Sequence, residues 1–564
     1  MPNIDQFYRL FRNLSLIFIT LVIITNLALD FSFPDSNLLK SHVLDFNSQS
    51  QQPKRDGFQI RKMLSNSRFN YQDSISVIPI LNGVDLNITA SGDYFKGYNL
   101  FELTEVPRGG GKKNRTLLII STEGDIFAEM KDYRHPTKFL TPDTVLCAKD
   151  IGNKEPNAVL WNIENNSTEI LDFFGHHDFE WNPNNDTFFV FLKYRIEIDG
   201  VDYIYDTIEE YTKAGQLVWS LDTRTFIPPT YLCPFHDLDN GAADMTHSNS
   251  IFFDPEEDIF YYNPRNPNTF YKIDHKTGEV IWGLGEYGNF TLFDQHGKKK
   301  ESLFYHAHAL EKVDENTFIL LDNNFHNQTG NVKARSRILE ITINEKTMTA
   351  NESWAWVAPR EYFSASVCDA DRLPNGNRLG TFGMNVHPNT NLGARVVEVN
   401  DTGHIVWEMN FPNKEETTYR IYHVDRFRFD PILSPVPDIQ YKEDDLIVTW
   451  QTWYGFRTNR RITENYTIYC NNKSIHNGKH TFEKFWQPTY LTVNLGNLEL
   501  KTSCIKVVFE DSQVLPTRNA NTTGFDFFLV IAVIFTFNFK MLNLGILKKE
   551  RAKSIISINK FQKK

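Results

Sequence analysis

Hydrophobic and polar positions alternate along most of this chain, and one pattern returns six times. A strand-like hydrophobic run leads into a short polar turn and then into a second run that ends near a tryptophan or a substitute for it. The copy at 273–282 reads Ile-Asp-His-Lys-Thr-Gly-Glu-Val-Ile-Trp. The six copies are 120–127, 161–170, 211–219, 273–282, 341–350 and 399–407. A hairpin repeated at intervals of roughly 40–70 residues is typical of a β-propeller.

Six copies predict a six-bladed β-propeller, which we place at 81–430 after a polar lead-in at 32–80. The expected units are 95–131, 137–173, 176–221, 247–283, 308–356 and 369–410. A blade holds four short strands, and the last part of such a chain often completes the first blade and so removes its open edge. We expect the segment 419–427 to supply that closing strand.

A second, smaller all-β domain is predicted at 438–518, after a proline-rich joint at 431–437. Its strand-like runs alternate between apolar and polar residues, as half-buried strands do. About 80 residues of this pattern favour an immunoglobulin-like or fibronectin-like β-sandwich. Cys470 and Cys504 both fall in this domain and are candidates for a disulfide. The other three cysteines are widely spread and show no metal-ligand spacing.

Both ends of the chain are predicted to meet a membrane. Two arginines precede an apolar run at 14–29, so residues 1–31 are either a signal peptide or a signal anchor or transmembrane helix. No small-residue cleavage site follows the run, which favours the uncleaved anchor. A second transmembrane helix is predicted at 525–547, with an amphipathic or buried helix as the alternative, and the basic tail 548–564 follows. The positive charges predict cytoplasmic termini, with the propeller and the sandwich on the extracytoplasmic side of the cell membrane.

Composition fits an outward-facing β protein. Aromatic residues make up 14% of the 564 residues, a share that favours strands. The formal net charge is −11 and no basic stripe runs through the body of the chain, which argues against nucleic acid as a partner. Glycosylation sequons predict an extracellular glycoprotein; they begin at Asn87, Asn114, Asn289, Asn327, Asn351, Asn400, Asn465 and Asn521.

Candidate chemistry lies at the residues that open consecutive propeller units. In a propeller the innermost strand of each blade starts at one face and runs along the central channel, so an opening residue points at the channel mouth. These positions are occupied by His177, His247, His308 and Asp369. Symmetry should therefore bring three histidines together that are far apart in sequence.

Two alternatives to a catalytic role for these histidines stay open. The repeats could share an opening histidine simply as a turn device, or the imidazoles could gather on zinc or copper. His306 and His308 form the one close pair, and alternation puts both on one strand face. We find no His-x-His set flanked by carboxylates, so we predict neither a metal nor a cofactor.

Six further motifs, in this order, resemble the arylsulfate sulfotransferase (arylsulfotransferase) family over about residues 95–410. They are Gly97-Tyr-Asn-Leu-Phe101, Met245-Thr-His-Ser-Asn-Ser-Ile251, His308-Ala-Leu310, Leu321-Asp-Asn-Asn324, Arg335-Ser-Arg-Ile-Leu-Glu340 and Arg372-Leu-Pro-Asn-Gly-Asn377. The resemblance implies a six-bladed propeller that moves a sulfuryl group from an aryl sulfate to a phenol without a nucleotide sulfate donor.

The resemblance also implies a set of site residues. The family uses a histidine nucleophile that becomes transiently sulfated, with two more histidines and an arginine as helpers. His387 matches the nucleophile, His247 and His308 match the helping histidines, and Arg337 matches the arginine. The lesser candidates are His306 and Arg335, and His177 is a channel neighbour without an assigned role.

These residue types suit sulfuryl transfer. A neutral imidazole is a good nucleophile near neutral pH. Arg337 and a protonated histidine would hold the sulfuryl oxygens by charge-assisted hydrogen bonds. The remaining histidine would protonate the leaving phenolate and later deprotonate the acceptor.

The leading interpretation is therefore a membrane-anchored, outward-facing sulfotransferase whose partners are a small aryl sulfate and a phenol. One alternative is a non-catalytic cell-surface propeller that acts as a receptor, adhesion or binding module. Another is a propeller metalloenzyme or a quinone-type dehydrogenase.

Overall fold

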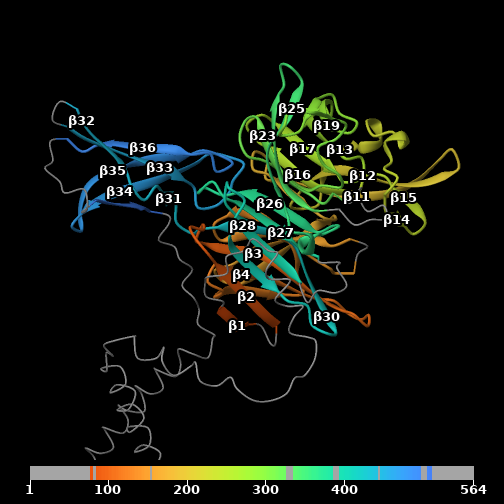
Figure 1. Ribbon diagram of the computed structural model, residues 1–564, viewed down its shortest axis with the longest axis horizontal. Coiled ribbons are helices and arrows are strands. Elements are labelled where there is room, and N and C mark those ends of the chain that lie inside the picture. The colour runs from red at the N-terminus through yellow and green to blue at the C-terminus, as the bar shows by residue number, and fades with distance from the viewer. Residues whose placement is uncertain are drawn as a thin grey trace, which may run out of the picture. The chain divides into compact units, whose positions relative to one another are not determined.

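The computed structural model describes residues 76–80, 84–152, 155–324, 335–384, 393–442, 445–496 and 505–510. These residues are almost entirely β-strands and turns (Figure 1), with three short 3₁₀ turns as the helical elements of the described part. The turns are η1 (Thr223–Thr225), η2 (Pro229–Tyr231) and η4 (Arg360–Tyr362). The all-β class predicted from the sequence is confirmed.

Six antiparallel sheets of at least four strands form the larger part of the described chain. The innermost strands are β30 (Thr417–Phe427), β6 (Arg134–Thr141), β10 (Phe179–Asn182), β16 (Ser248–Asp254), β22 (His308–Lys312) and β26 (Cys368–Arg372). Each of these strands contacts the next, and β26 contacts β30, so the six strands form a closed ring. A closed ring of radial sheets is a six-bladed β-propeller.

Three further strands complete each blade from the inside outward. Blade one continues with β3 (Tyr98–Pro107), β4 (Asn114–Ser121) and β5 (Ile126–Lys131). Blade two continues with β7 (Thr144–Lys149), β8 (Asn157–Asn162) and β9 (Ser167–Phe174). Blade three continues with β11 (Thr187–Ile198), β12 (Val201–Thr212) and β13 (Leu217–Asp222). Blade four continues with β17 (Ile259–Pro264), β18 (Thr269–Asp274) and β19 (Val280–Gly285). Blade five continues with β23 (Thr317–Asp322), β24 (Arg337–Asn344) and β25 (Thr349–Val357). Blade six continues with β27 (Arg378–Phe382), β28 (Ala394–Val399) and β29 (Ile405–Phe411).

Short extra strands extend three of the blades. They are β14 (Leu238–Asp239) and β15 (Ala242–Asp244) on blade three, β20 (Thr291–Phe293) and β21 (Lys299–Lys300) on blade five, and β1 (Ser76–Ile80) and β2 (Val84–Ala90) on blade six. The hairpin β1–β2 pairs with β29 and covers the outer edge of blade six. Strand β1 lies inside the segment 32–80 that the sequence assigned to the lead-in.

The repeated sequence pattern corresponds to one structural unit. All six copies form the turn between the third and fourth strands of a blade, at β4–β5, β8–β9, β12–β13, β18–β19, β24–β25 and β28–β29. In each pair the ladder is interrupted by a β-bulge or irregularity, which lies near the end of the third strand in blades one, three, four and six. Bulges increase local twist, so the repeat marks where each blade turns outward.

Strand β30 closes the ring from the far end of the chain. It pairs with β3 along its length, from Tyr98 against Phe427 to Pro107 against Thr417. The expected closing segment 419–427 lies within it. Because blade one takes its inner strand from the end of the propeller, no inner edge remains open among the described strands.

A separate group of strands follows the propeller (Figure 1, blue). One sheet contains β31 (Ile432–Leu433), β32 (Asp438–Lys442), β33 (Asp445–Trp453) and β36 (Thr489–Asn494); the other contains β34 (Ile462–Cys470), β35 (Lys473–Phe482) and β37 (Ile505–Phe509). Along β33 every second residue is buried, as period-two patterning requires. Side chains of both sheets share one core, which contains Val448, Ile468 and Phe482.

The cysteines divide between the two parts of the chain. Cys470 is disulfide-bonded, which agrees with the predicted pair; Cys504 lies outside the described residues. Cys147, Cys233 and Cys368 are free and buried in the propeller.

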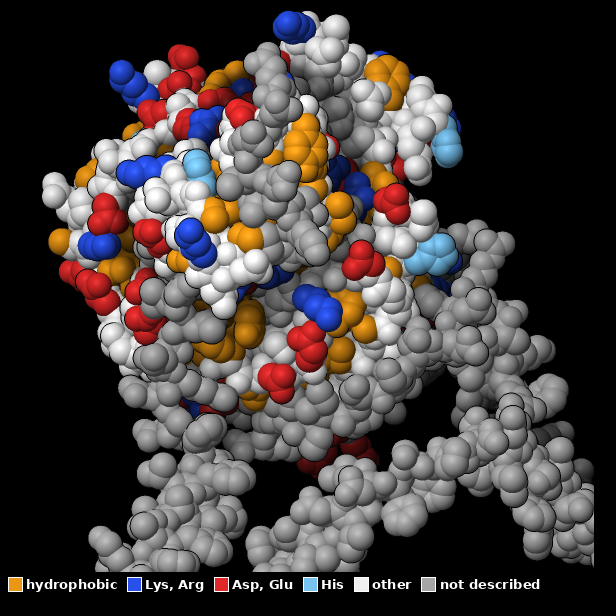
Figure 2. Space-filling model, turned by 90° about the vertical axis from the view of Figure 1, so that its left-hand side faces the viewer, with side chains coloured by type: hydrophobic (Ala, Val, Ile, Leu, Met, Phe, Trp, Pro, Cys, Tyr) orange, Lys and Arg blue, Asp and Glu red, His pale blue; other side chains and the backbone are white. Residues whose placement is uncertain are grey.

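No helix among the described residues is long and apolar enough to span a lipid bilayer. The predicted segments 1–31, 525–547 and 548–564 all lie outside the described residues, so the membrane anchors stay predictions. Figure 2 shows acidic and basic side chains interspersed over one face of the molecule.

Candidate functional site

Five consecutive blades open with the same backbone turn. The residue at each opening has a positive φ, at His135 (46°), His177 (63°), His247 (46°), His306 (55°) and Val367 (54°). Side chains other than glycine adopt this conformation at a cost, so its recurrence shows that the turn is built into the repeat. His306, rather than His308, is therefore the backbone equivalent of His177 and His247.

The two neighbouring histidines of blade five face different surroundings. His306 is fully buried, and its Nε2 lies 3.3 Å from the Cys233 sulfur. His308, two residues further along the chain at the start of β22, lies with its ring centroid 6.1 Å from that of Tyr422 in β30. His308 is thus the histidine of this pair that faces the channel.

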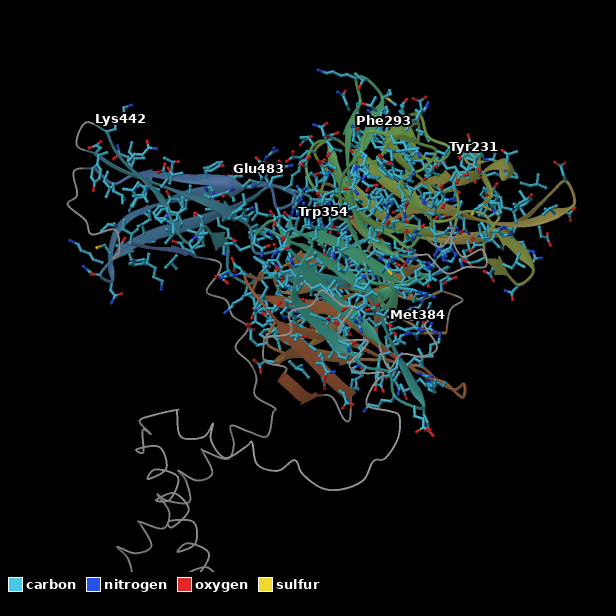
Figure 3. All side chains as sticks on the ribbon, viewed as in Figure 1. Tyr231, Phe293, Trp354, Met384, Lys442 and Glu483 are labelled. Carbon is cyan, nitrogen blue, oxygen red and sulfur yellow. The ribbon has the colours of Figure 1, made fainter. Side chains whose placement is uncertain are left out.

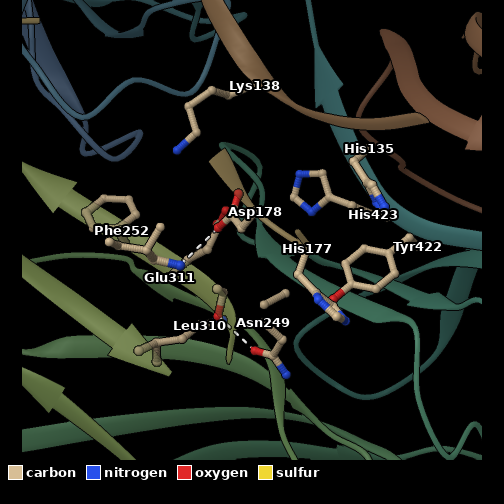
Figure 4. Close-up of a pocket in the computed structure, with 13 residues that line it drawn as sticks. His135, Lys138, His177, Asp178, Asn249, Phe252, Leu310, Glu311, Tyr422 and His423 are labelled. Carbon is tan, nitrogen blue, oxygen red and sulfur yellow. Dashed lines mark hydrogen bonds between the residues drawn. The ribbon is translucent and has the colours of Figure 1, made fainter. Parts of the chain in front are cut away.

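Tyr422 is surrounded by histidine rings from three blades. Its ring centroid lies 5.4 Å from that of His135, 5.9 Å from His177 and 6.1 Å from His308. His177 is also in edge contact with His247, at 5.0 Å between ring centroids. The Tyr422 hydroxyl is buried and has no hydrogen-bond partner among the described residues. Figure 4 shows His135, His177, Tyr422 and His423 around the same cavity.

His247 forms a dyad with a carboxylate. Its Nδ1 lies 2.7 Å from Asp244 Oδ2, and its backbone N–H donates to the other oxygen of Asp244 at 3.1 Å. Asp237, 3.8 Å from the same ring nitrogen, also accepts from Arg265 Nη1 at 2.5 Å. A proton on Nδ1 satisfies Asp244 and leaves Nε2 as the reactive nitrogen. Both aspartates belong to the segment that connects blades three and four.

His308 is held by a neutral partner instead. Its Nδ1 lies 2.7 Å from Asn323 Oδ1, and the Asn323 amide donates to the Ser364 carbonyl at 2.9 Å. Burial, reinforced by the nearby charge of Arg265, lowers the pKa of His308 to about 3. His308 is therefore uncharged near neutral pH, and with Nδ1–H directed at Asn323 its Nε2 carries the lone pair.

His423, beside Tyr422 in β30, is a cation. Its Nδ1 lies 2.9 Å from Asp369 Oδ2 and its Nε2 lies 3.5 Å from Asp425 Oδ1. Burial opposes the charged form, but the carboxylates of Asp369 and Asp425 outweigh it and raise the pKa of His423 well above its ordinary value. A fixed positive charge thus lies in the wall of the cavity.

A hydrogen-bonded chain leads from His177 into blade three. The Nδ1 atoms of His177 and His176 lie 2.6 Å apart, and His176 Nε2 lies 2.9 Å from Asp206 Oδ1. The second oxygen of Asp206 accepts from the Thr246 hydroxyl at 2.7 Å and from the Ser248 backbone N–H at 2.8 Å. No sequence pattern indicates this chain, because its members come from three different segments.

The arginine candidates do not join the histidines. Arg337 bonds within blade five, to Asp322 at 2.9 Å, to Glu352 at 3.2 Å and to the Leu303 carbonyl at 2.6 Å. Arg335 is exposed, and its carbonyl accepts from the Asn324 side chain at 3.2 Å. Arg265 does approach the cluster, since its backbone N–H donates to the His247 carbonyl at 3.2 Å and its side chain binds Asp237.

The structure thus brings together three of the predicted histidines, His177, His247 and His308. His387, the predicted nucleophile, lies outside the described residues. Sequence reasoning missed His135, His176, Tyr422 and His423. Alternation within the predicted closing strand could have indicated one of Tyr422 and His423, because consecutive strand residues point to opposite faces. Both line the cavity because β30 has one extra residue here relative to β3.

The cavity beside the histidines has an empty volume of about 520 Å³. The histidines that line it are His135, His177 and His423, and its lining also includes Lys138, Asp178 and Phe252 (Figure 4). Toward the other end of the inner strands, Arg457 from the loop after β33 binds Asp371 at 2.8 Å, the Lys312 carbonyl at 2.9 Å and the Glu311 carboxylate. The side chain of Arg457 is buried there, so the second domain occupies the end of the channel opposite the histidines.

The connection between blades three and four also forms part of the mouth. Tyr231, labelled in Figure 3, stacks on Tyr287 with ring centroids 4.1 Å apart. Cys233, two residues later, contacts His306. Within the described part of the chain, no group of three or more His, Cys, Asp or Glu side chains is arranged to hold a metal ion.

Residues 162–423 match the sequence profile of the Arylsulfotransferase (ASST) family. This part of the chain is similar to the arylsulfotransferase family. The resemblance noted from the sequence is thereby confirmed, and the match contains every channel histidine named above except His135. A comparison with curated proteins gave no match.

The solved structures that resemble this chain are distant. TolB from Acinetobacter baumannii is 13% identical, covers 58% of this chain and 67% of its own, with a TM-score of 0.34. A chain of the nidogen/laminin complex is also 13% identical, with coverages of 58% and 97% and a TM-score of 0.32. A 6-phosphogluconolactonase-like protein from Bacteroides uniformis is 10% identical, with coverages of 70% and 99% and a TM-score of 0.33. Likeness at this level carries no argument about activity.

Proposed function

We propose that this protein is an aryl sulfate sulfotransferase that moves a sulfuryl group from a phenolic sulfate ester to a phenolic acceptor through a sulfohistidine intermediate. The observation that carries the proposal is the contact of His177 and His308 with Tyr422, and of His247 with His177, in the part of the chain that matches the arylsulfotransferase family. A nucleotide donor is not needed, because the aryl sulfate itself supplies the activated sulfuryl group.

Among the residues that the structure describes, His308 is the best candidate for the nucleophile. Its Nε2 attacks the sulfur of the donor while the bond from sulfur to the aryl oxygen breaks. The electron pair of that bond leaves with the phenolate, which takes up a proton from a neighbouring histidine. In the second half of the reaction an acceptor phenol loses its proton to that histidine, its oxygen attacks sulfur, and the N–S bond breaks. A weakly basic nitrogen also leaves readily in that step. His387 stays a candidate from the sequence.

The other side chains of the channel supply complementary charge and proton transfer. The cation of His423 and the hydroxyl of Tyr422 are suited to hold the sulfuryl oxygens, since charge-assisted hydrogen bonds are the strong ones. His177 and His247, which are in edge contact, are the candidates for the general acid and base, and Asp244 orients His247. Arg337 would contribute to the stability of blade five rather than to substrate binding.

Incubation with a chromogenic aryl sulfate and a phenol tests the proposal. We expect release of the coloured phenol, sulfation of the acceptor, and a sulfated histidine on the peptide that contains His308 after a rapid quench at alkaline pH. His308→Gln should abolish the labelled peptide and the transfer. His404→Gln, at an exposed histidine of the outer β28–β29 turn, is the matched control and should retain both.

The opposite results would separate the alternatives. A label on the His387 peptide would move the nucleophile to that residue. Binding of aryl sulfates without turnover would favour a non-catalytic binding module. The location outside the cell and the two membrane anchors are separate proposals, and protease protection of tagged termini in intact cells tests them.

A further inference from the structure

A buried polar chain behind His177 has no role in the reaction as described so far. It contains His176 and Asp206, which are 3% and 1% exposed, and it ends on the Thr246 hydroxyl and the Ser248 backbone N–H. Buried polar networks whose members are all satisfied are specific and rigid. Only its first member, His177, lines the cavity.

The hydrogen bonds define how protons are arranged along the chain. The Asp206 carboxylate accepts from Thr246 and Ser248 at one oxygen, so its other oxygen accepts from His176 Nε2–H. His176 Nδ1 then carries a lone pair and accepts from His177 Nδ1–H at 2.6 Å. With its proton on Nδ1, His177 has a lone pair on Nε2 that can accept a proton from a molecule in the channel.

We propose that His176 and Asp206 form a proton relay that stores, away from the channel, the proton which His177 takes from the acceptor phenol. The inference rests on the proposed sulfuryl transfer. His177 Nε2 accepts the phenolic proton while His177 Nδ1–H passes to His176 Nδ1. His177 is then neutral again, and His176, now protonated on both nitrogens, pairs with the Asp206 carboxylate. The relay holds this proton when the next donor binds. Cleavage of the donor reverses these transfers and gives the proton to the leaving phenolate, so one full cycle neither gains nor loses a proton.

The surroundings of His177 disfavour a charge on its own ring. His177 faces His247 at the opening of β16, His135 in β6, Lys193 in β11 and the ring of Tyr422 in β30. Burial, followed by repulsion from a proton on His176 or His247, lowers the pKa of His177 well below its ordinary value.

Asp206 supplies the matching negative charge. Burial opposes its ionisation, but the charge of His176 and the hydrogen bonds from His176 and Ser248 lower its pKa below the ordinary value. His176 is therefore a positioning and proton-holding residue that touches no substrate. His177 is the group that meets the acceptor, next to His308 across Tyr422.

Histidine pKa values in the full chain provide a test that does not depend on activity. Exchange of the imidazole C2 hydrogen, followed by mass spectrometry, reports the pKa of individual histidines. We expect Asp206→Asn to lower the pKa of the His176–His177 pair by at least one unit. His275→Gln is the matched control, because His275 is also partly buried between carboxylates, Asp258 at 2.7 Å and Glu210 at 3.0 Å, but outside the channel. It should leave the pair unchanged.

Kinetics connect the relay to transfer. Asp206→Asn should lower kcat about tenfold or more, leave the donor KM within about twofold, and move the acid limb of the pH profile to lower pH. His176→Asn serves as the second variant in case Asp206→Asn fails to fold, and should give the same kinetic pattern.

Each outcome decides a different point. An unchanged pKa of the pair in Asp206→Asn would overturn the relay. A changed donor KM with an unmoved pH profile in both variants would show that the hydrogen-bonded His176–Asp206 pair is only structural, which would also overturn the relay. A shifted pKa in a protein that transfers no sulfuryl group would overturn the proposed function and the role of the relay in it, while leaving the hydrogen-bonded chain itself in place.

Discussion

The strand that closes the propeller is held by a fully buried ion pair, whose disruption gives the sharpest test of the fold. Arg426 in β30 and Glu398 in β28 are both 0% exposed, and Arg426 Nη1 lies 3.0 Å from Glu398 Oε2. Arg426 also donates to Asn99 Oδ1 at 2.6 Å and to the Phe95 carbonyl at 2.7 Å. The pair thus joins the last blade to the first.

Glu398→Gln removes the negative charge and keeps the shape. The other oxygen of Glu398 accepts from the Phe95 backbone N–H at 2.8 Å and from the Asn377 side chain at 2.7 Å, and a glutamine oxygen can keep these bonds. What is lost is the partner of a buried guanidinium stacked on Trp407, 4.4 Å from its ring centroid. Removing one member of a buried pair leaves an uncompensated charge and costs about 3–5 kcal/mol.

Equilibrium urea unfolding followed by far-ultraviolet circular dichroism measures that loss. Asp430→Asn, which breaks the exposed pair with Arg428, is the control and should change the free energy of unfolding by about 0.5 kcal/mol or less. The double variant Glu398→Gln with Arg426→Met should recover part of the loss, because no charge is then buried. A loss below about 1 kcal/mol in the single variant, or no recovery in the double variant, would refute the reasoning.

Three further predictions concern single side chains. The pKa of His423 is higher in the folded protein than in the unfolded chain. Its contribution to stability is therefore complete below the unfolded pKa and disappears as pH rises through the folded pKa. In urea titrations, the difference in free energy of unfolding between wild type and His423→Gln should shrink over that pH range. Arg337→Gln should lower the melting temperature, because it orphans Asp322, while kcat changes less than about threefold; a loss of kcat at full stability would restore Arg337 to the site. Gly383→Ala would place a Cβ 1.6 Å from the Ile421 carbonyl oxygen and should cost about 2 kcal/mol or more in urea unfolding, whereas Gly109→Ala, with nothing within 4 Å, should be tolerated; equal effects would contradict the packing argument.

The repeated hairpin was sufficient to predict the propeller, because every copy forms the same outer turn of a blade. Local alternation and turn residues encode that turn directly. The alignment of blade openings agrees with the structure at His177 and His247. It is two residues off in blades five and six, where His306 and Val367 rather than His308 and Asp369 hold the equivalent position. A β-bulge between His308 and Glu311, with a positive φ of 52° at Ala309, shifts the inner strand of blade five. Such an irregularity depends on packing and leaves little trace in the pattern.

Two of the three partners of the histidines could not be predicted from spacing. Asp244 is only three residues from His247. Asp206 comes from the middle of β12 and Asn323 from the region after β23, and strand pairing within blades three and five brings them to His176 and His308. Arg337 shows the converse, since its motif matches the family while its side chain is engaged by Asp322 and Glu352.

Insertion of β30 as the innermost strand of the first blade has a consequence for the order in which the protein becomes functional. A ribosome synthesises blades one to six before it reaches Thr417, so the nascent propeller exists for a time as an open ring with an unpaired first blade. Tyr422 and His423 arrive with the strand that closes it. Closure and completion of the channel wall are therefore one event, and a chain arrested or cleaved before that strand would carry most of the fold and none of the finished site.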